Sequence, residues 1–225
     1  MQTSYSNPRS DPATTAEQPS HGTLFLVHIP GNAGGSIRKA FGQNGGNHRA
    51  YHHQTAKKLY QAFQSARTKQ LFCVIRDPIE RALKSWSWAS RQTTWNPLVS
   101  NEEAKVYSAL FLSSDPSKFF ESVDFPALVS VCHHFTPQCK YLDLPGEIDL
   151  ISFDALQEGL DGLVAHYGGE QIVLGDKKVH ASNRPSSEFI SNFAKERILD
   201  FYKNDLALYE SMSKNKPLWK GAIYD

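Results

Sequence analysis

The stretch that decides the fold is residues 23–41, which read TLFLVHIPGNAGGSIRKAF. An apolar run typical of a buried strand passes through a glycine-rich bend into an amphipathic helical pattern. Glycine lets the backbone fold close to an anion, and the first amides of a helix have no acceptor within the helix. The helix dipole favours negative charge at the same place. The stretch therefore predicts a phosphate-binding loop between a strand and a helix.

The loop differs from the phosphate loop of ordinary ATP and GTP hydrolases. In that motif a lysine stands between the last glycine and the Ser or Thr, whereas here Ser36 directly follows Gly35. An ordinary nucleotide hydrolase is therefore disfavoured. Taken by itself, the loop could also be a purely structural turn.

A second informative stretch is residues 71–91, which read LFCVIRDPIERALKSWSWASR. Leu71 to Ile75 predicts a buried parallel strand, and Arg76 follows at its carboxyl end, where open α/β sheets bind ligands. Asp77, Pro78 and Glu80 then have the order of a helix N-cap, a first helical residue and a capping-box acid. A buried arginine here needs an anionic partner, which could be a ligand or a salt bridge to Asp77 or Glu80.

Together the two stretches resemble the sulfotransferases that use 3′-phosphoadenosine 5′-phosphosulfate (PAPS), in particular their carbohydrate-type branch. The family motifs HIPKTGGTS and RDPxxR correspond to residues 28–36 and 76–81. The resemblance continues, in the family's order, through residues 134–138 (HFTPQ), 148–156 and 183–184. It implies one α/β domain over residues 21–225, with a central parallel sheet flanked by helices and a P-loop-like sulfotransferase fold.

The resemblance implies PAPS as cofactor, its product 3′-phosphoadenosine 5′-phosphate (PAP), and no metal. It assigns the 5′-phosphosulfate to the loop and the 3′-phosphate to the second stretch. Asn183 and Arg184 would close over the nucleotide, or would instead form a solvated basic turn. The cofactor-binding residues expected in these two elements are Gly31, Asn32, Ala33, Gly34, Gly35, Ser36, Ile37, Arg76, Lys84 and Ser85.

Two departures from the family concern charge at the cofactor. Gly31 stands where the family loop has a lysine, and Lys84 stands where the second element has a serine, with Ser85 one step later. Lys84 could hold the 3′-phosphate as a point charge. Arg38 or Lys39 could supply the missing loop cation or could face solvent. The loss at Gly31 leaves open a nucleotide-binding protein with impaired transfer, and a small-molecule kinase is the third alternative.

Histidine is the expected general base, because it titrates near neutral pH. The resemblance favours His53, with His52 second, although adjacent histidines in a polar loop can simply be solvated. We expect His28 to brace the loop rather than to bind the sulfate. His134 is expected to be structural rather than to line the acceptor pocket. Three tryptophans could form an acceptor wall or an adenine platform, or could belong to the core: Trp86, Trp88 and Trp95.

The amino-acid composition limits the classes of protein to which the chain can belong. A net charge of +1 in 225 residues argues against a dedicated nucleic-acid binder and favours a small metabolite or sugar as acceptor. Residues 1–20 have no apolar run and predict a disordered tail. No stretch approaches the length of a membrane helix, and three cysteines form no disulfide framework, so we expect a cytoplasmic protein. The sequence shows no metal-ligand spacing and leaves the oligomeric state open.

Further elements follow from capping signals and periodicity. A strand is predicted over residues 148–152, followed by a helix capped by Asp154 that runs to about Tyr167. Other helices are predicted over residues 55–67 and 101–112, and from Asp115. The last helix is predicted over residues 186–209, with Phe189 and Phe193 on its apolar face.

Overall fold

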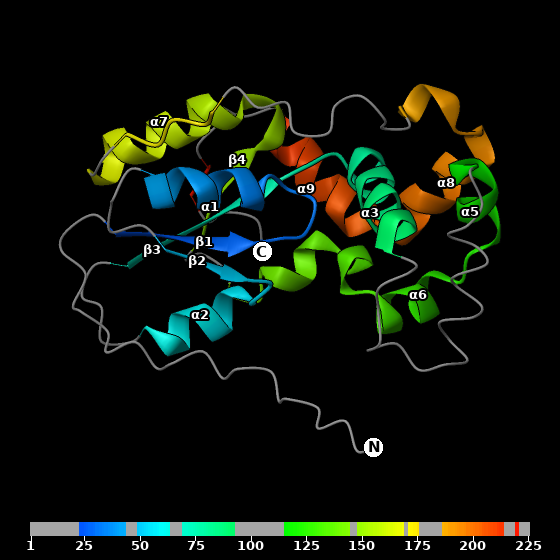
Figure 1. The fold of residues 1–225 in the computed structure, drawn as a ribbon, viewed down its shortest axis with the longest axis horizontal. Helices are drawn as coiled ribbons and strands as arrows, with labels where there is room; N and C mark the ends of the chain where they lie inside the picture. The colour runs from blue at the N-terminus through cyan, green and yellow to red at the C-terminus, as the bar shows by residue number, and fades with distance from the viewer. Residues whose placement is uncertain are drawn as a thin grey trace, which may run out of the picture.

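A five-stranded sheet forms the centre of the molecule, in the order β2-β1-β3-β4-β5 (Figure 1). The computed structural model describes residues 23–43, 49–63, 69–92, 115–144, 148–168, 171–175, 186–213 and 219–220. The strands are β1 (Thr23–His28), β2 (Arg49–His52), β3 (Lys69–Ile75), β4 (Ile148–Ser152) and β5 (Trp219–Lys220). Strands β1 to β4 are parallel, and β5 runs antiparallel to β4 at one edge.

Both faces of the sheet are covered, because alternate residues of each strand point to opposite sides. Leu24 and Leu26 of β1 pack with helices α1 (Gly34–Gln43) and α7 (Leu156–Tyr167). Phe25 and Val27 pack on the other side, with α2 (Ala56–Ala62) and α9 (Lys203–Ser213). Figure 1 shows α1 and α7 on one side of the strands and α2 on the other. This arrangement confirms the predicted α/β class with a central parallel sheet flanked by helices.

A second core lies beyond the carboxyl ends of the strands (Figure 1). It is built by helices α3 (Pro78–Gln92), α5 (Pro116–Ser122), α6 (Phe125–Val131) and α8 (Asn192–Phe201). Aromatic side chains dominate this core, among them Phe119, Phe120, Phe125, Phe135 and Trp86. The helices therefore form a packed wall next to the sheet edge at which parallel strands end.

Local capping signals predicted several element starts correctly. The Asp77 carboxylate accepts a hydrogen bond from the Glu80 amide at 2.9 Å, and α3 begins at Pro78. Asp115 caps α5 in the same way through the Ser117 amide. Strand β4 spans residues 148–152, as expected. These starts depend on contacts within three residues, which the sequence displays directly.

Strand β2 is absent from the sequence-based prediction, which placed polar loop and then helix between residues 44 and 70. Residues 49–52 instead pair in parallel with β1, and His52 is in register with His28. The strand carries no apolar alternation, so its pairing is set by β1 rather than by its own pattern. As a result, residue 53 directly follows the carboxyl end of an edge strand.

The C-terminal helix prediction is wrong in two respects. Helices α8 and α9 are separate and meet at Tyr202, whose hydroxyl donates to the Phe135 carbonyl at 2.7 Å. Phe189 and Phe193 are 78% and 57% exposed, so they do not belong to the buried face. No proline or glycine marks the break between α8 and α9 in the sequence, and the hydrogen bond at the break joins residues that lie far apart in the chain.

The cap predicted for α7 is also wrong. The Asp154 carboxylate accepts a hydrogen bond from the Tyr209 hydroxyl at 2.6 Å, and no side chain caps the helix. A short 3-10 turn, Phe153–Ala155, precedes α7 and is capped by Ser152. Asp154 therefore joins this turn to α9 instead of starting a helix.

Several expectations lie outside the described residues. These are the tail of residues 1–20, the helix at 101–112, Trp95, Asn183 and Arg184. Within the described part of the chain, no helix has both the length and the apolar character needed to cross a membrane.

Candidate active site

The loop between β1 and α1 has an unusual backbone. Gly31 has a φ of 85° and Ala33 a φ of 62°, in the left-handed region that costs most side chains about 1–2 kcal/mol. The Ala33 carbonyl accepts from the amides of both Ser36 and Ile37. The amides of Gly34 and Gly35 are the first of the helix and precede its internal ladder. This end of α1 is therefore the part of the loop that can face an anion.

Glycine at position 34 has a specific reason. A Cβ atom there would lie 1.9 Å from Cδ2 of His28, so the imidazole ring packs directly against the backbone. His28 is the last residue of β1 and is buried. Position 35, in contrast, has no atom within 4 Å of a Cβ and is exposed. The first glycine is required by packing, and the second leaves the helix start open to solvent.

The remaining predicted loop residues divide into buried and exposed ones. Ile37 is fully buried in the core beside α1, so its side chain does not reach the outer surface of the loop. The Asn32 side chain is also buried and donates to the Val74 carbonyl at 2.6 Å and to Oε1 of Gln138. Ser36 is exposed in the first turn of α1. Asn32 thus fastens the loop to β3, and Ser36 is the side chain of this group that is open to solvent.

Arg76 lies where the sequence placed it, at the end of β3, and is 6% exposed. Its Nη1 donates to the Gly31 carbonyl at 3.2 Å, and its Nη2 lies 3.6 Å from the Glu80 carboxylate. The guanidinium also covers the Phe153 ring at 4.3 Å from the centroid. The salt bridge to Glu80, one of the two partners considered from the sequence, is therefore present, and Arg76 also binds the loop backbone.

Lys84 and Ser85 of α3 lie beside Gly31. A Cβ on Gly31 would lie 3.7 Å from Cγ of Lys84 and 3.8 Å from Oγ of Ser85. The Ser85 hydroxyl donates to the His134 carbonyl at 2.8 Å. Lys84 is half-buried, with its aliphatic stem against the loop. A lysine on α3 thus occupies the neighbourhood of the loop position at which the sequence lacks one.

Two buried residues that were not predicted hold this site together. Arg81 is 1% exposed, and it donates to the carbonyls of Pro30, His134 and Thr136 at 3.2, 3.2 and 2.7 Å. Gln138 is fully buried and exchanges hydrogen bonds with the backbone of Arg76 in both directions. Both belong to stretches that the sequence singled out, but the spacing of those stretches does not show which carbonyls they bind.

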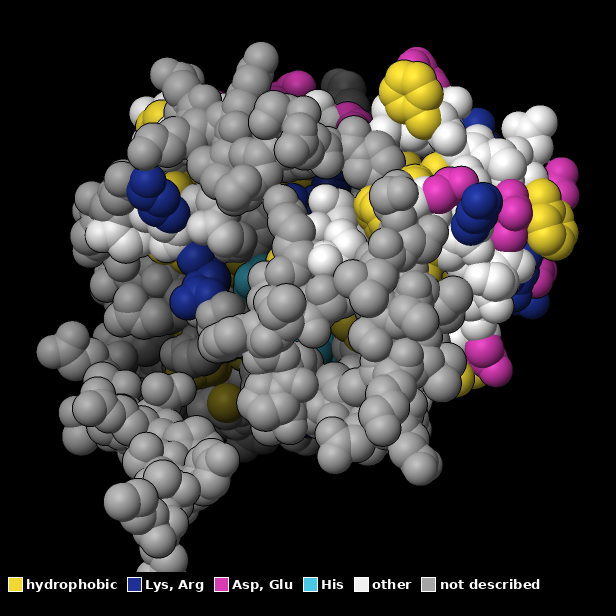
Figure 2. Space-filling view, turned by 45° about the vertical axis from the view of Figure 1, so that its right-hand side comes forward, with side chains coloured by type: hydrophobic (Ala, Val, Ile, Leu, Met, Phe, Trp, Pro, Cys, Tyr) yellow, Lys and Arg dark blue, Asp and Glu magenta, His cyan; other side chains and the backbone are white. Residues whose placement is uncertain are grey.

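The candidate base His53 follows β2 and has a φ of 49°. Its ring centroid lies 5.0 Å from that of His28, 4.6 Å from that of His133 and 5.5 Å from that of His134. For the second candidate, His52, the structure describes the backbone alone. Four imidazoles therefore meet at the carboxyl edge of β1 and β2. In Figure 2 small areas of histidine are visible between other atoms, with Lys and Arg side chains nearby.

The surroundings of His133 and His134 disfavour protonation of their imidazoles. Burial, followed by the neighbouring His133, His53, Arg81 and His28, lowers the pKa of His134 to about 2. Burial also lowers the pKa of His133. The His134 ring stacks on Trp88, with centroids 3.6 Å apart and planes 6° apart. Trp88 therefore belongs to the site, whereas Trp86 belongs to the helical core.

One ligand nitrogen each of His53, His133 and His134 lies within 4.8 Å of the others. The sequence showed no metal-ligand spacing, because residue 53 and residues 133–134 are 80 positions apart in the chain. Parallel pairing of β2 with β1 and the 3-10 turn His133–Phe135 bring them together. The sequence feature that could have pointed to this group was the high number of histidines, nine in 225 residues.

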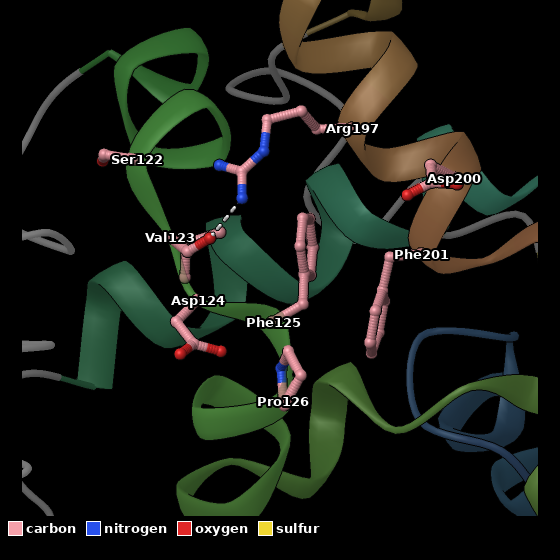
Figure 3. Close-up of a pocket in the computed structure, with 8 residues that line it drawn as sticks. All are labelled: Ser122, Val123, Asp124, Phe125, Pro126, Arg197, Asp200 and Phe201. Atoms are coloured by element: carbon pink, nitrogen blue, oxygen red, sulfur yellow. Dashed lines mark hydrogen bonds between the residues drawn. The ribbon is translucent and has the colours of Figure 1, made fainter.

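A separate cavity of about 440 Å³ lies between α5, α6 and α8 (Figure 3). Arg197 lines it and donates to the carbonyls of Phe120, Glu121 and Val123, which end α5. Asp124 also lines it and caps α6 through the Ala127 amide. None of the predicted site residues lines this cavity, and two of its charged groups are occupied in capping helix ends.

No known family profile and no curated protein sequence matches the chain. A solved structure that is similar in fold is titled as a sulfotransferase from Alicyclobacillus acidocaldarius. It is 13% identical in sequence, covers 89% of this chain and 98% of its own, and superposes with a TM-score of 0.45. At this distance its residues do not assign roles to residues of this chain.

Proposed function

We propose that this protein is a sulfotransferase that moves a sulfuryl group from PAPS to a hydroxyl or amine of a small metabolite or sugar. The observation that carries the proposal is the contact series from the loop to the candidate base. Gly34 at the start of α1 packs against His28, and His28 lies beside His53. An anion held by the loop amides and an acceptor group deprotonated by His53 would then be neighbours.

The reaction needs a base, stabilisation of the transferring oxygens and a hold on the leaving phosphate. In the proposed step the acceptor oxygen or nitrogen attacks sulfur, and His53 takes the acceptor proton. The bond from sulfur to the bridging oxygen breaks, and its electron pair leaves with PAP. The amides at the start of α1 and the cation of Lys84 would stabilise the charge that develops on the leaving phosphate.

Lys84 is the side chain that we propose in place of the absent loop lysine. Its stem lies beside Gly31, so its ammonium group would supply a point charge close to the loop. The guanidiniums of Arg76 and Arg81 bind the loop carbonyls of Gly31 and Pro30. We propose that these two arginines position the loop and that Asn183 and Arg184 complete the nucleotide site.

An acceptor of low charge agrees with the net charge of +1, which gives no strong attraction to polyanions. All three cysteines, Cys73, Cys132 and Cys139, are free thiols, which agrees with the reducing compartment that we propose for the protein. We propose no nucleic-acid or membrane partner.

Calorimetric titration of the full chain with PAP, 5′-AMP and ATP plus magnesium tests the cofactor. PAP should bind at least about tenfold more tightly than 5′-AMP, a difference of about 1.4 kcal/mol. Lys84→Met should weaken PAP binding by a similar factor, while Lys118→Met, on the exposed side of α5, should not. Equal binding of PAP and ATP plus magnesium would overturn the proposal in favour of a kinase.

Transfer itself is tested with PAPS and a panel of hydroxyl and amine acceptors. His53→Gln should lose most of the transfer rate and keep PAP binding, as expected for a base. The observation that favours a second function, PAP binding without transfer, is Gly31 in place of the family's lysine. PAP binding without turnover on any acceptor would support that second function.

A further inference from the structure

The three histidines at the carboxyl edge of the sheet form a compact ligand set. His53 and His134 are half-buried, His133 is exposed, and one nitrogen of each lies within 4.8 Å of the other two. Zinc binds imidazole nitrogen at about 2.0–2.1 Å in tetrahedral geometry, which places ligand nitrogens about 3.4 Å apart. The separations in the structure are at most 4.8 Å, and rotation of imidazole side chains can close the difference from that upper bound.

We propose that His53, His133 and His134 bind a divalent transition metal of the zinc class through three imidazole ligands, with a fourth position open. Three protein ligands and one open position are typical of zinc sites that perform chemistry rather than hold a fold together. The set contains no carboxylate, so Mg²⁺ and Ca²⁺, which prefer oxygen ligands, should not compete for it.

The backbone of two ligands is fixed from several directions, which favours a preformed site. The His134 ring stacks on Trp88, and the His134 carbonyl accepts hydrogen bonds from Arg81 and Ser85. The His133 carbonyl accepts from the Thr136 amide and the Tyr141 hydroxyl. Such supporting contacts orient ligands before the metal arrives. The exposed His133 ring leaves a path for the ion from solvent.

His53 is held differently, by a left-handed backbone conformation directly after β2. Histidine adopts this conformation more readily than most side chains, and strained residues of this kind gather at ligand sites. The bound ion would occupy the lone-pair nitrogen of His53 and would place a positive charge next to His28 and the loop, so the metal-bound protein would not use His53 as the base of the proposed transfer. Metal binding does not depend on the proposed sulfuryl transfer, since the ligand set is complete without nucleotide.

The test is a titration of chelator-treated full-length protein with Zn²⁺, and separately with Co²⁺, in the absence of nucleotide. We expect one ion per chain and, for Co²⁺, the visible absorption bands of a four- or five-coordinate site. His133→Ala should weaken binding by about tenfold or more. The control is His166→Ala, which removes an exposed histidine of α7 outside the cluster.

Because His133 is exposed, its replacement should leave the metal-free thermal unfolding curve unchanged, and this is measured in parallel. Absence of one-to-one binding of both ions would overturn the proposal. Equal weakening by His133→Ala and His166→Ala would overturn it as well, since binding would then be general to surface histidines. PAP binding is measured in a separate titration, so failure of the metal proposal and failure of the proposed function can be told apart.

Discussion

Arg81 at the sheet edge and Arg197 beside the helical cavity make the same number of backbone contacts. Each donates to three carbonyl oxygens. The acceptors of Arg197 all lie within residues 120–123, at the end of one helix, and Arg197 lines the cavity between α5, α6 and α8 (Figure 3). The acceptors of Arg81 lie in two segments about a hundred residues apart, and the Arg81 side chain is buried. With the same number of hydrogen bonds, Arg197 caps the end of one helix, whereas Arg81 joins two distant segments at the candidate site.

The largest expected effect is the difference between these two arginines. Arg81→Met removes the donor of the Pro30 and Thr136 carbonyls and one of two donors of the His134 carbonyl, at a position that is 1% exposed. It should lower the free energy of unfolding by about 3 kcal/mol or more. Arg197→Met should cost less, about 1 kcal/mol, because Arg197 is only half-buried and lines a cavity that water can enter once its side chain is removed. Urea denaturation of both variants measures the difference.

If Arg81→Met does not fold, Arg81→Lys provides the measurement. It keeps the charge but cannot reach all three carbonyls, and it should be less stable than Arg197→Lys. If both arginine variants lower the free energy of unfolding by the same amount, a hydrogen bond that joins distant segments stabilises the protein no more than a local one.

The two glycines at the start of α1 give the next contrast. Gly34→Ala drives a methyl group into the His28 ring and should cost about 3 kcal/mol. Gly35→Ala meets open space and should be neutral or stabilising by about 0.5 kcal/mol. Thermal and urea unfolding of the pair would contradict the packing argument if both changes proved harmless.

The left-handed residues of the loop should respond in opposite directions. Gly31→Ala should lose about 1 kcal/mol through backbone strain, although its Cβ has ordinary space. Ala33→Gly relieves strain at the cost of a more flexible unfolded chain, with a net gain of about 0.5 kcal/mol. A gain in stability for Gly31→Ala would show that the loop is not held in this conformation in solution.

The smallest difference in stability between two paired variants is expected for a helix cap, which is a contact within three residues of the chain. Asp77→Ala removes the cap of α3 and should cost about 1 kcal/mol. Asp200→Ala, on the exposed side of α8, should change stability by less than about 0.5 kcal/mol. If the unfolding curves of the two aspartate variants overlap, the Asp77 cap does not stabilise the start of α3.

These contrasts also explain what the sequence could predict. Strands β1, β3 and β4, the loop and the start of α3 follow from apolar runs and capping residues, because their signals span only a few positions. The α/β class followed from their order. Strand β2 was missed because it is short and polar, and its place depends on pairing with β1.

The sequence indicated which segments lie near the loop, but it did not show which hydrogen bonds the side chains make there. Gly34, Arg76 and Lys84 come together near the loop as the sequence indicated. The roles of Arg81 and Gln138 were not visible, because their partners are carbonyl oxygens, which every residue carries. The histidine group required knowledge of two long-range pairings at once, of β2 with β1 and of the 3-10 turn with α3.

Strand β2 pairs only with β1 among the described strands. Few hydrogen bonds therefore have to break for β2 to separate from the sheet. Edge segments can detach with far less free energy than global unfolding requires. His53 therefore belongs to a unit that can open and close while β1, β3 and β4 stay paired. Native-state amide exchange of residues 49–53 should be faster than that of β3, and a ligand that contacts both the loop and His53 should slow it. Occupancy of the site would thus be recorded in the exchange rates of its outermost strand.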